Sequence, residues 1–154
     1  MKTTLSILVA NGVNLDLIGT REPNIYGYQT LIDLQHVLKK EANQLNTYFS
    51  SHNIQLDFFQ SNNEADYLEK ISQPYDGALL NPGAWTHTSL ALGDRLAALK
   101  LTFIEVHLSN ISNREPIRQR SFCQAHAQGV VCGLGVDAYT VGLFALLKKI
   151  HSPA

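Results

Sequence analysis

Short apolar runs alternate with helix-like patterns along the whole chain. Five runs have the length and composition of strands: residues 5–10, 54–59, 77–80, 101–106 and 129–132. The first, third and fourth runs are apolar at nearly every position, which is typical of parallel strands covered on both faces. We therefore expect a buried parallel sheet with helices on both of its sides.

The segments between these runs have helical periodicity. Predicted helices cover 30 to about 50, 63–72, 88–99 and 137–150, and another begins at Asn113 with Pro116 in its first turn. Thr30 and Asp33 have the spacing of a capping box, and Thr86 or Thr88 is expected to cap the third helix. The alternation predicts an α/β, flavodoxin-like three-layer sandwich whose five-stranded parallel sheet has the order 2-1-3-4-5.

Composition narrows the class of protein. The 154 residues fit a single domain spanning 1–154, and 45% apolar residues exclude disorder. The formal charge of −1 gives no electrostatic basis for binding nucleic acid or a membrane surface. We find no membrane-length apolar run and no signal peptide, and Cys123 and Cys132 form no CxxC pair. These features predict a cytoplasmic protein, and the charged fraction of only 16% favours an oligomer.

The connection after the first strand, residues 11–29, is unusually long for a compact domain. It contains three glycines, together with Arg21 and Tyr26. In parallel sheets, ligands bind beyond the carboxyl ends of the strands, at the switch point between strands 1 and 3. The loop is therefore either an ordinary surface loop whose arginine is solvated, or an active-site lid whose arginine stabilises a tyrosine phenolate.

Polar side chains also follow the third and fourth strands. Asn81 and His87 come after the third strand, where they either bind a ligand or lie beside a helix cap. Glu105 and His107 are two positions apart at the end of the fourth strand, so both side chains project from the same side. A carboxylate beside an imidazole suits a general acid, although an isolated Glu-x-His also arises often by chance.

Two arginines, Arg114 and Arg118, are spaced one helical turn apart beyond this strand, where they either bind a carboxylate or are solvated. Asp94 lies two turns into its helix and is expected to face a neighbour. No metal-ligand spacing, dinucleotide fingerprint, P-loop or nucleophile elbow occurs, so we expect no metal, and the binding of a dinucleotide or through a P-loop is disfavoured. No role is assigned to the remaining histidines, His36, His52, His126 and His151.

Four blocks of the sequence resemble type II 3-dehydroquinate dehydratase. They are NGVNLDLIGTREPNIYG, LLNPGAWTHTSLALGD, FIEVHLSN and NREPIRQRSF, and they follow the order of that family over most of the chain. The resemblance implies dehydration of 3-dehydroquinate to 3-dehydroshikimate, without a cofactor or a metal, in the shikimate or quinate pathway. It also implies a flavodoxin-like fold and a homododecamer built from four trimers.

The family's catalytic roles transfer to five matching positions. Tyr26 matches the base that removes a proton from C2, and Arg21 the arginine that keeps this base ionised. Asn14 matches the asparagine at the enolate and its water. His107 matches the acid that protonates the leaving hydroxyl, and Glu105 its partner. The implied reaction is an anti elimination, with base and acid on opposite sides of the substrate ring.

The resemblance also identifies substrate-binding positions, at Asn81, His87, Asp94, Leu108, Ser109 and Arg118. In the family, the residue that matches Asp94 comes from a neighbouring subunit of the trimer. The chain departs from the family pattern at Val13, where proline is usual, at Ala65, and around Arg118.

Two other classes of function remain alternatives. One is a flavodoxin-like module that binds FMN or a phosphorylated ligand, since the fold alone permits it. The other is a hydrolase that uses His107 and Glu105, although no serine or cysteine is placed as its nucleophile. Cys123 and Cys132 are expected to be packing residues.

Overall fold

Five parallel strands form one sheet in the order β2-β1-β3-β4-β5 in the computed structural model, which describes residues 2–152. The predicted flavodoxin-like order is thereby confirmed. The strands are longer than predicted at several ends, and β4 includes His107. Their bounds are β1 Thr3–Asn11, β2 His52–Gln60, β3 Gly77–Asn81, β4 Phe103–His107 and β5 Gly129–Cys132.

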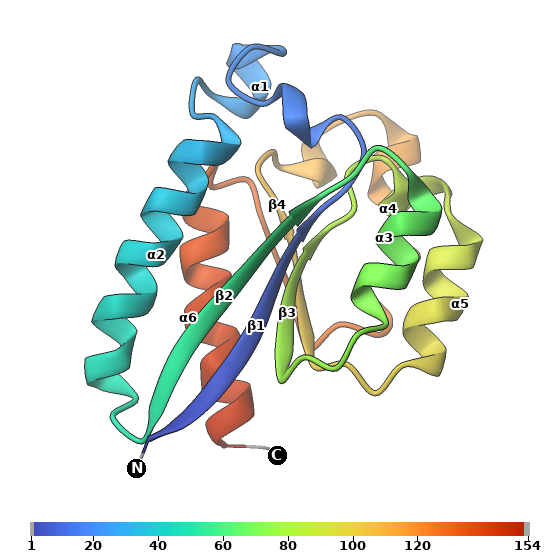
Figure 1. Cartoon of the computed structure of the whole chain (residues 1–154). Coiled ribbons are helices and arrows are strands. Elements are labelled where there is room, and N and C mark those ends of the chain that lie inside the picture. The colour runs from blue at the N-terminus through green and yellow to red at the C-terminus, as the bar shows by residue number, and fades with distance from the viewer. Residues whose placement is uncertain (1, 153–154) are drawn as a thin grey trace.

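Helices cover both faces of the sheet (Figure 1). Helices α2 (Leu31–Tyr48) and α6 (Asp137–His151) cover one face, and α3 (Glu64–Ile71) and α5 (Leu90–Ala98) cover the other. Within residues 2–152, no helix has both the length and the apolar character needed to cross a membrane.

Strand β1 contributes to both cores because its side chains alternate. Ile7 and Val9 pack into the core beneath α2 and α6, whereas Leu8 and Ala10 pack into the core beneath α3 and α5. All four are fully buried. A strand flanked by helices on both faces must be apolar at successive positions, which explains the continuous hydrophobic run at the start of the sequence.

Helix starts follow the predicted caps in some places and not in others. The capping box of Thr30 and Asp33 is present at α2. The predicted caps Thr86 and Thr88 are wrong, because both lie inside the short helix α4 (Trp85–Thr88), which precedes α5. The cap of α5 is Ser89, whose hydroxyl accepts a hydrogen bond from the amide of Leu92 at 2.9 Å.

The helix predicted from Asn113 does not form. The connection between β4 and β5 (residues 108–128) instead contains two single turns of 3-10 helix, η2 (Ile111–Asn113) and η3 (Pro116–Gln119). Pro116 donates no backbone hydrogen bond and holds the preceding residue extended, which prevents a continuous helix through this point. The cap of η2 is Asn110, and Asn113 lies within the turn.

Strands β1, β3 and β4 all end at the side of the molecule opposite the two chain termini (Figure 1). The loops after β1 and β3 approach each other closely there. The amide of Gly12 donates to the carbonyl of Asn81 at 2.8 Å, and a Cβ at residue 12 would lie 2.2 Å from the carbonyl oxygen of Pro82. Only glycine allows this contact between two main chains, which brings the two loops to one edge.

We therefore expect Gly12→Ala to lower the free energy of unfolding by about 1–3 kcal/mol, because the loops must move apart to admit a methyl group. Gly129→Ala is the matched control, since a Cβ there meets only Ile104 Cδ1 at 3.8 Å. It should change the stability by less than about 0.5 kcal/mol. Urea unfolding measures both variants, and equal stabilities would contradict the close contact at Gly12.

Candidate active site

A pocket opens at the carboxyl ends of β1, β3 and β4, with an empty volume of about 570 Å³ that includes open space at its mouth. The predicted site residues gather here, except for two. Glu105 lies behind His107, and Asp94 is exposed on α5 outside the pocket lining. The predicted residues that line the pocket are Asn14, Arg21, Tyr26, Asn81, His87, His107, Leu108, Ser109 and Arg118.

The loop after β1 (residues 11–29, the lid loop) is anchored to the end of the neighbouring strand β2. Asn14 has a left-handed backbone with φ of 64°, and its backbone N–H donates to Asn62 Oδ1 at 2.8 Å. Gln60 Nε2 donates to the carbonyl of Gly12 at 3.2 Å and to Asn62 Oδ1 at 3.1 Å. These contacts fix the base of the lid loop and place Asn14 in the pocket wall.

Tyr26 ends the short helix α1 (Pro23–Tyr26) of the lid loop, and two guanidinium groups lie near it. Arg114 Nη1 donates to the Tyr26 hydroxyl oxygen at 2.7 Å. Arg21 has its Cζ 5.4 Å from the centre of the Tyr26 ring and pairs with Glu22 at 3.1 Å. Arg21, the arginine expected beside this tyrosine, therefore contacts the ring. The hydroxyl is bound by Arg114, which the sequence did not assign to Tyr26.

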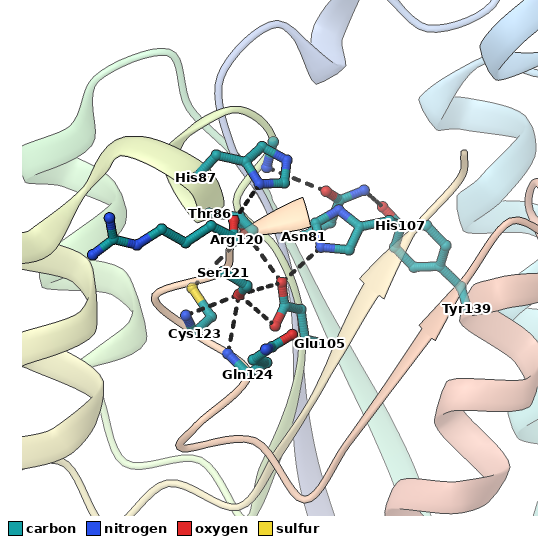
Figure 2. Close-up of polar contacts among 11 residues, drawn as sticks. Asn81, Thr86, His87, Glu105, His107, Arg120, Ser121, Cys123, Gln124 and Tyr139 are labelled. Atoms are coloured by element: carbon teal, nitrogen blue, oxygen red, sulfur yellow. Dashed lines mark hydrogen bonds and ion pairs between the residues drawn. The ribbon is translucent and has the colours of Figure 1, made fainter. Parts of the chain in front are cut away.

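Glu105 and His107 form the buried centre of the site (Figure 2). His107 Nε2 donates to Glu105 Oε1 at 2.7 Å, as the alternation along β4 predicts. Two further hydroxyls donate to this carboxylate: Thr86 Oγ1 to Oε1 at 3.3 Å, and Ser121 Oγ to both oxygens at 3.0 Å. Because Nε2 is bound to the carboxylate, Nδ1 is the ring nitrogen of His107 left for a ligand.

His87 is held by the main chain. Its Nδ1 donates to the carbonyl oxygen of Arg120 at 2.7 Å, so the neutral ring presents an unprotonated Nε2. Burial lowers the pKa of His87, and the nearby His107 and Arg118 lower it further, against the opposing effect of the Arg120 carbonyl. His87 therefore acts as a neutral hydrogen-bond acceptor at pH 7.

The amide of Asn81 is oriented by two neighbours. Its Nδ2 donates to the Tyr139 hydroxyl at 2.7 Å, and its Oδ1 accepts from the amide of Gly83 at 3.2 Å. Tyr139 in turn donates to Asn11 Oδ1 at 2.6 Å. Burial raises the pKa of Tyr139, so this tyrosine stays a neutral link between α6 and the ends of β1 and β3.

The two arginines of the β4–β5 connection both lie near the carboxylate of Glu115. Arg118 Nε donates to Glu115 Oε2 at 2.9 Å, and Arg114 Nε lies 3.6 Å from the same oxygen while its Nη1 donates to Tyr26. The helix that would have aligned them is absent. Both nevertheless line the pocket, so each guanidinium is available to the interior of the site.

Sequence reasoning missed several residues that hold the site together: Asn62, Thr86, Arg120 and Ser121, and Arg114 as the partner of Tyr26. Thr86 and Ser121 carried no pattern that pointed to Glu105, because they come from different connections of the sheet. Asn62 lies two residues after the end of β2, so its place beyond a strand end is a signal that could have found it.

The titratable groups outside the pocket offer no metal centre among residues 2–152, where no three His, Cys, Asp or Glu side chains gather. Both cysteines are free thiols. Burial and the nearby Glu105 carboxylate raise the pKa of Cys123 to about 12, so its thiol stays protonated. A buried, protonated thiol fits the expected packing role and not that of a nucleophile.

A family model described as Dehydroquinase class II matches residues 5–147. The chain belongs to the class II dehydroquinase family. The expectation of an enzyme of this family, a hydro-lyase, is thereby confirmed. Neither the flavin-binding module nor the hydrolase is favoured by this membership.

Relatives and solved structures of the family match over nearly their whole length. The 3-dehydroquinate dehydratase of Enterobacter sp. (strain 638) is 44% identical over 153 residues, covering 97% of each chain. That of Methylococcus capsulatus is 46% identical over 149 residues, covering 94% of this chain and 96% of its own. The type II dehydroquinase structure from Butyrivibrio crossotus has a TM-score of 0.85 at 34% identity, covering 94% of this chain and 98% of its own. That from Propionibacterium acnes has a TM-score of 0.81 at 34% identity and covers 99% and 100%.

We expect the pKa of His87 to lie below its ordinary value of 6.5, so the ring is neutral at pH 7. The one proton of the neutral ring should then be on Nδ1. Nitrogen-15 NMR of the imidazole rings measures both properties. The unfolded chain protonates this histidine first, so its contribution to stability is present above pH 6.5 and declines as the pH falls below that value. Protonation at or above pH 6.5, or a proton on Nε2, would contradict the proposed acceptor.

Proposed function

We propose that this pocket dehydrates 3-dehydroquinate to 3-dehydroshikimate by an anti elimination, in the shikimate or the quinate pathway. Tyr26 is the base and His107 the general acid. The observation that carries the proposal is that the two groups line one pocket from different elements, the lid loop and the end of β4. The relatives described above are named 3-dehydroquinate dehydratases, which supports the same substrate.

The base requires stabilisation of a negative charge on the Tyr26 oxygen. Arg114 donates a charge-assisted hydrogen bond to that oxygen, and Arg21 adds a second positive charge near the ring. Both guanidinium groups are held in the pocket wall, where water competes less than at an open surface. Together they favour the phenolate that abstracts a proton from C2, next to the substrate ketone.

The first step produces an enolate, whose oxygen also needs a partner. Asn14 is the proposed partner, through its side chain and a bound water. Its left-handed backbone and its contact with Asn62 hold it in the wall of the pocket. Groups placed in advance where charge develops stabilise a transition state without having to reorganise.

The second step breaks the bond between C1 and its hydroxyl oxygen. The electron pair of the enolate forms the new carbon–carbon double bond, and the hydroxyl leaves as water with the proton of His107. Glu105 stabilises the protonated imidazole through the 2.7 Å contact with Nε2, which leaves Nδ1 as the proton donor. The proton taken from C2 resides on Tyr26 and passes to solvent, while His107 regains a proton from solvent.

Substrate recognition is assigned to groups around the reacting atoms. His87 accepts a hydrogen bond from a substrate hydroxyl through Nε2, and Asn81 binds another polar group beside it. Arg118 binds the substrate carboxylate. The segment at Leu108 and Ser109 completes the binding surface at the end of β4.

Asp94 is proposed to act on a neighbouring subunit, because it is exposed on α5 and lies outside the pocket of its own chain. We propose that the chain assembles into a homododecamer built from four trimers, in which Asp94 reaches the pocket of a neighbouring subunit of its trimer. Sedimentation equilibrium measures the mass, and a monomer of 17.1 kDa at assay concentrations would contradict the assembly.

Adding 3-dehydroquinate to the protein should produce the ultraviolet absorbance of a conjugated enone. Tyr26→Phe should lower kcat at least about 100-fold, because it removes the base, and it should leave substrate binding nearly unchanged. Tyr28→Phe is the matched control, since Tyr28 lies in the same loop and is 78% exposed.

The folded wild-type protein must produce the enone signal, and its absence would contradict the proposed reaction. Full activity of Tyr26→Phe would contradict the base alone. A loss of activity shared by Tyr28→Phe would indicate damage to the loop instead of loss of a proton acceptor.

A further inference from the structure

The carboxylate of Glu105 lies fully buried at the centre of the site. Among residues 2–152, its only ion-pair partner is the imidazole of His107. Transferring a charged carboxylate from water to a protein interior is strongly unfavourable unless donors surround it. The groups that donate to Glu105 therefore decide whether it remains charged and in one orientation.

Ser121 is the better placed of the two hydroxyl donors. Its Oγ lies 3.0 Å from both oxygens of Glu105, whereas Thr86 Oγ1 reaches only Oε1, at 3.3 Å. Thr86 Oγ1 also lies 3.8 Å from Cys123 Sγ, so its hydroxyl proton can be donated either to Glu105 or to this sulfur.

The main chain fixes the direction of the Ser121 proton. A serine hydroxyl has one proton to donate and two lone pairs that accept. The amides of Cys123 and Gln124 both donate to Ser121 Oγ at 3.0 Å. With both lone pairs engaged, the single proton points to Glu105, as the arrangement in Figure 2 illustrates.

We propose that Ser121 is a positioning residue for the general acid, acting through Glu105 on His107. The inference rests on the proposed function, because it assumes that His107 delivers the proton. The two amides orient Ser121, Ser121 holds the carboxylate charged and fixed, and the carboxylate holds the imidazole by Nε2. Nδ1 of His107 then stays directed to the substrate in the protonated form.

Ser121→Ala should lower kcat about tenfold or more, while KM changes less than about threefold, since Ser121 lies behind the pocket wall. The basic limb of the pH profile of kcat should move to lower pH, because the general acid His107 loses part of the support for its protonated form. Ser121→Thr keeps the hydroxyl and should restore both properties in large part. Ser112→Ala is the matched control, from the same connection but with an exposed side chain.

A double-mutant cycle separates this role from a merely structural one. Ser121→Ala should have less than about a twofold effect on kcat in a Glu105→Gln background, because the group through which it acts is already neutral. Equal fold-losses in both backgrounds would overturn the proposal. A kcat within twofold of wild type, with an unmoved basic limb, would also overturn it.

Ser121→Cys covers the case in which the alanine variant fails to fold. The thiol fills the same space but donates weakly, so kcat should fall and the basic limb should still move. A folded Ser121→Cys enzyme with wild-type kcat and pH profile would overturn the inference. All variants are compared with the wild-type enone assay, so a failure of the proposed reaction is visible separately in the wild-type protein.

Discussion

The contact between Glu105 and His107 is the interaction on which the site depends. It joins two residues of one strand at its carboxyl end, so the rigid sheet sets its geometry. Since the carboxylate is fully buried, the donors around it replace the hydrogen bonds that water would otherwise make. The proposed acid is therefore fixed at the strand end, and the other groups of the pocket are arranged around it, including the proposed base on the lid loop.

The irregular connection between β4 and β5 supplies the groups that hold three side chains of the site in place. Arg114 binds the Tyr26 hydroxyl, the Arg120 carbonyl binds His87, and Ser121 binds Glu105. In a continuous helix, the carbonyls and amides of this segment would bond to one another. The irregular main chain instead leaves the Arg120 carbonyl free to bind His87, and the amides of Cys123 and Gln124 free to orient Ser121.

Much of this fold could be predicted because its signals are local. The apolar strands and the strand alternation predicted the sheet order and the placement of Glu105 beside His107. The length of the loop after β1 left open whether it is a solvated surface loop or part of the site, and in the structure it lines the pocket. The contact between Arg114 and Tyr26 could not be predicted from spacing, since 88 residues separate them and an irregular segment brings them together. Ser121 was missed for the same reason.

In the proposed reaction, the base and the acid act from opposite sides of the substrate ring. Two samples of 3-dehydroquinate test it most directly, each carrying deuterium at one of the two C2 positions. Mass spectrometry of the product then reports which position is lost. Deuterium trans to the C1 hydroxyl should pass to solvent, while deuterium cis to it should remain in the product. Retention of the trans label and loss of the cis label would contradict the placement of Tyr26 opposite His107.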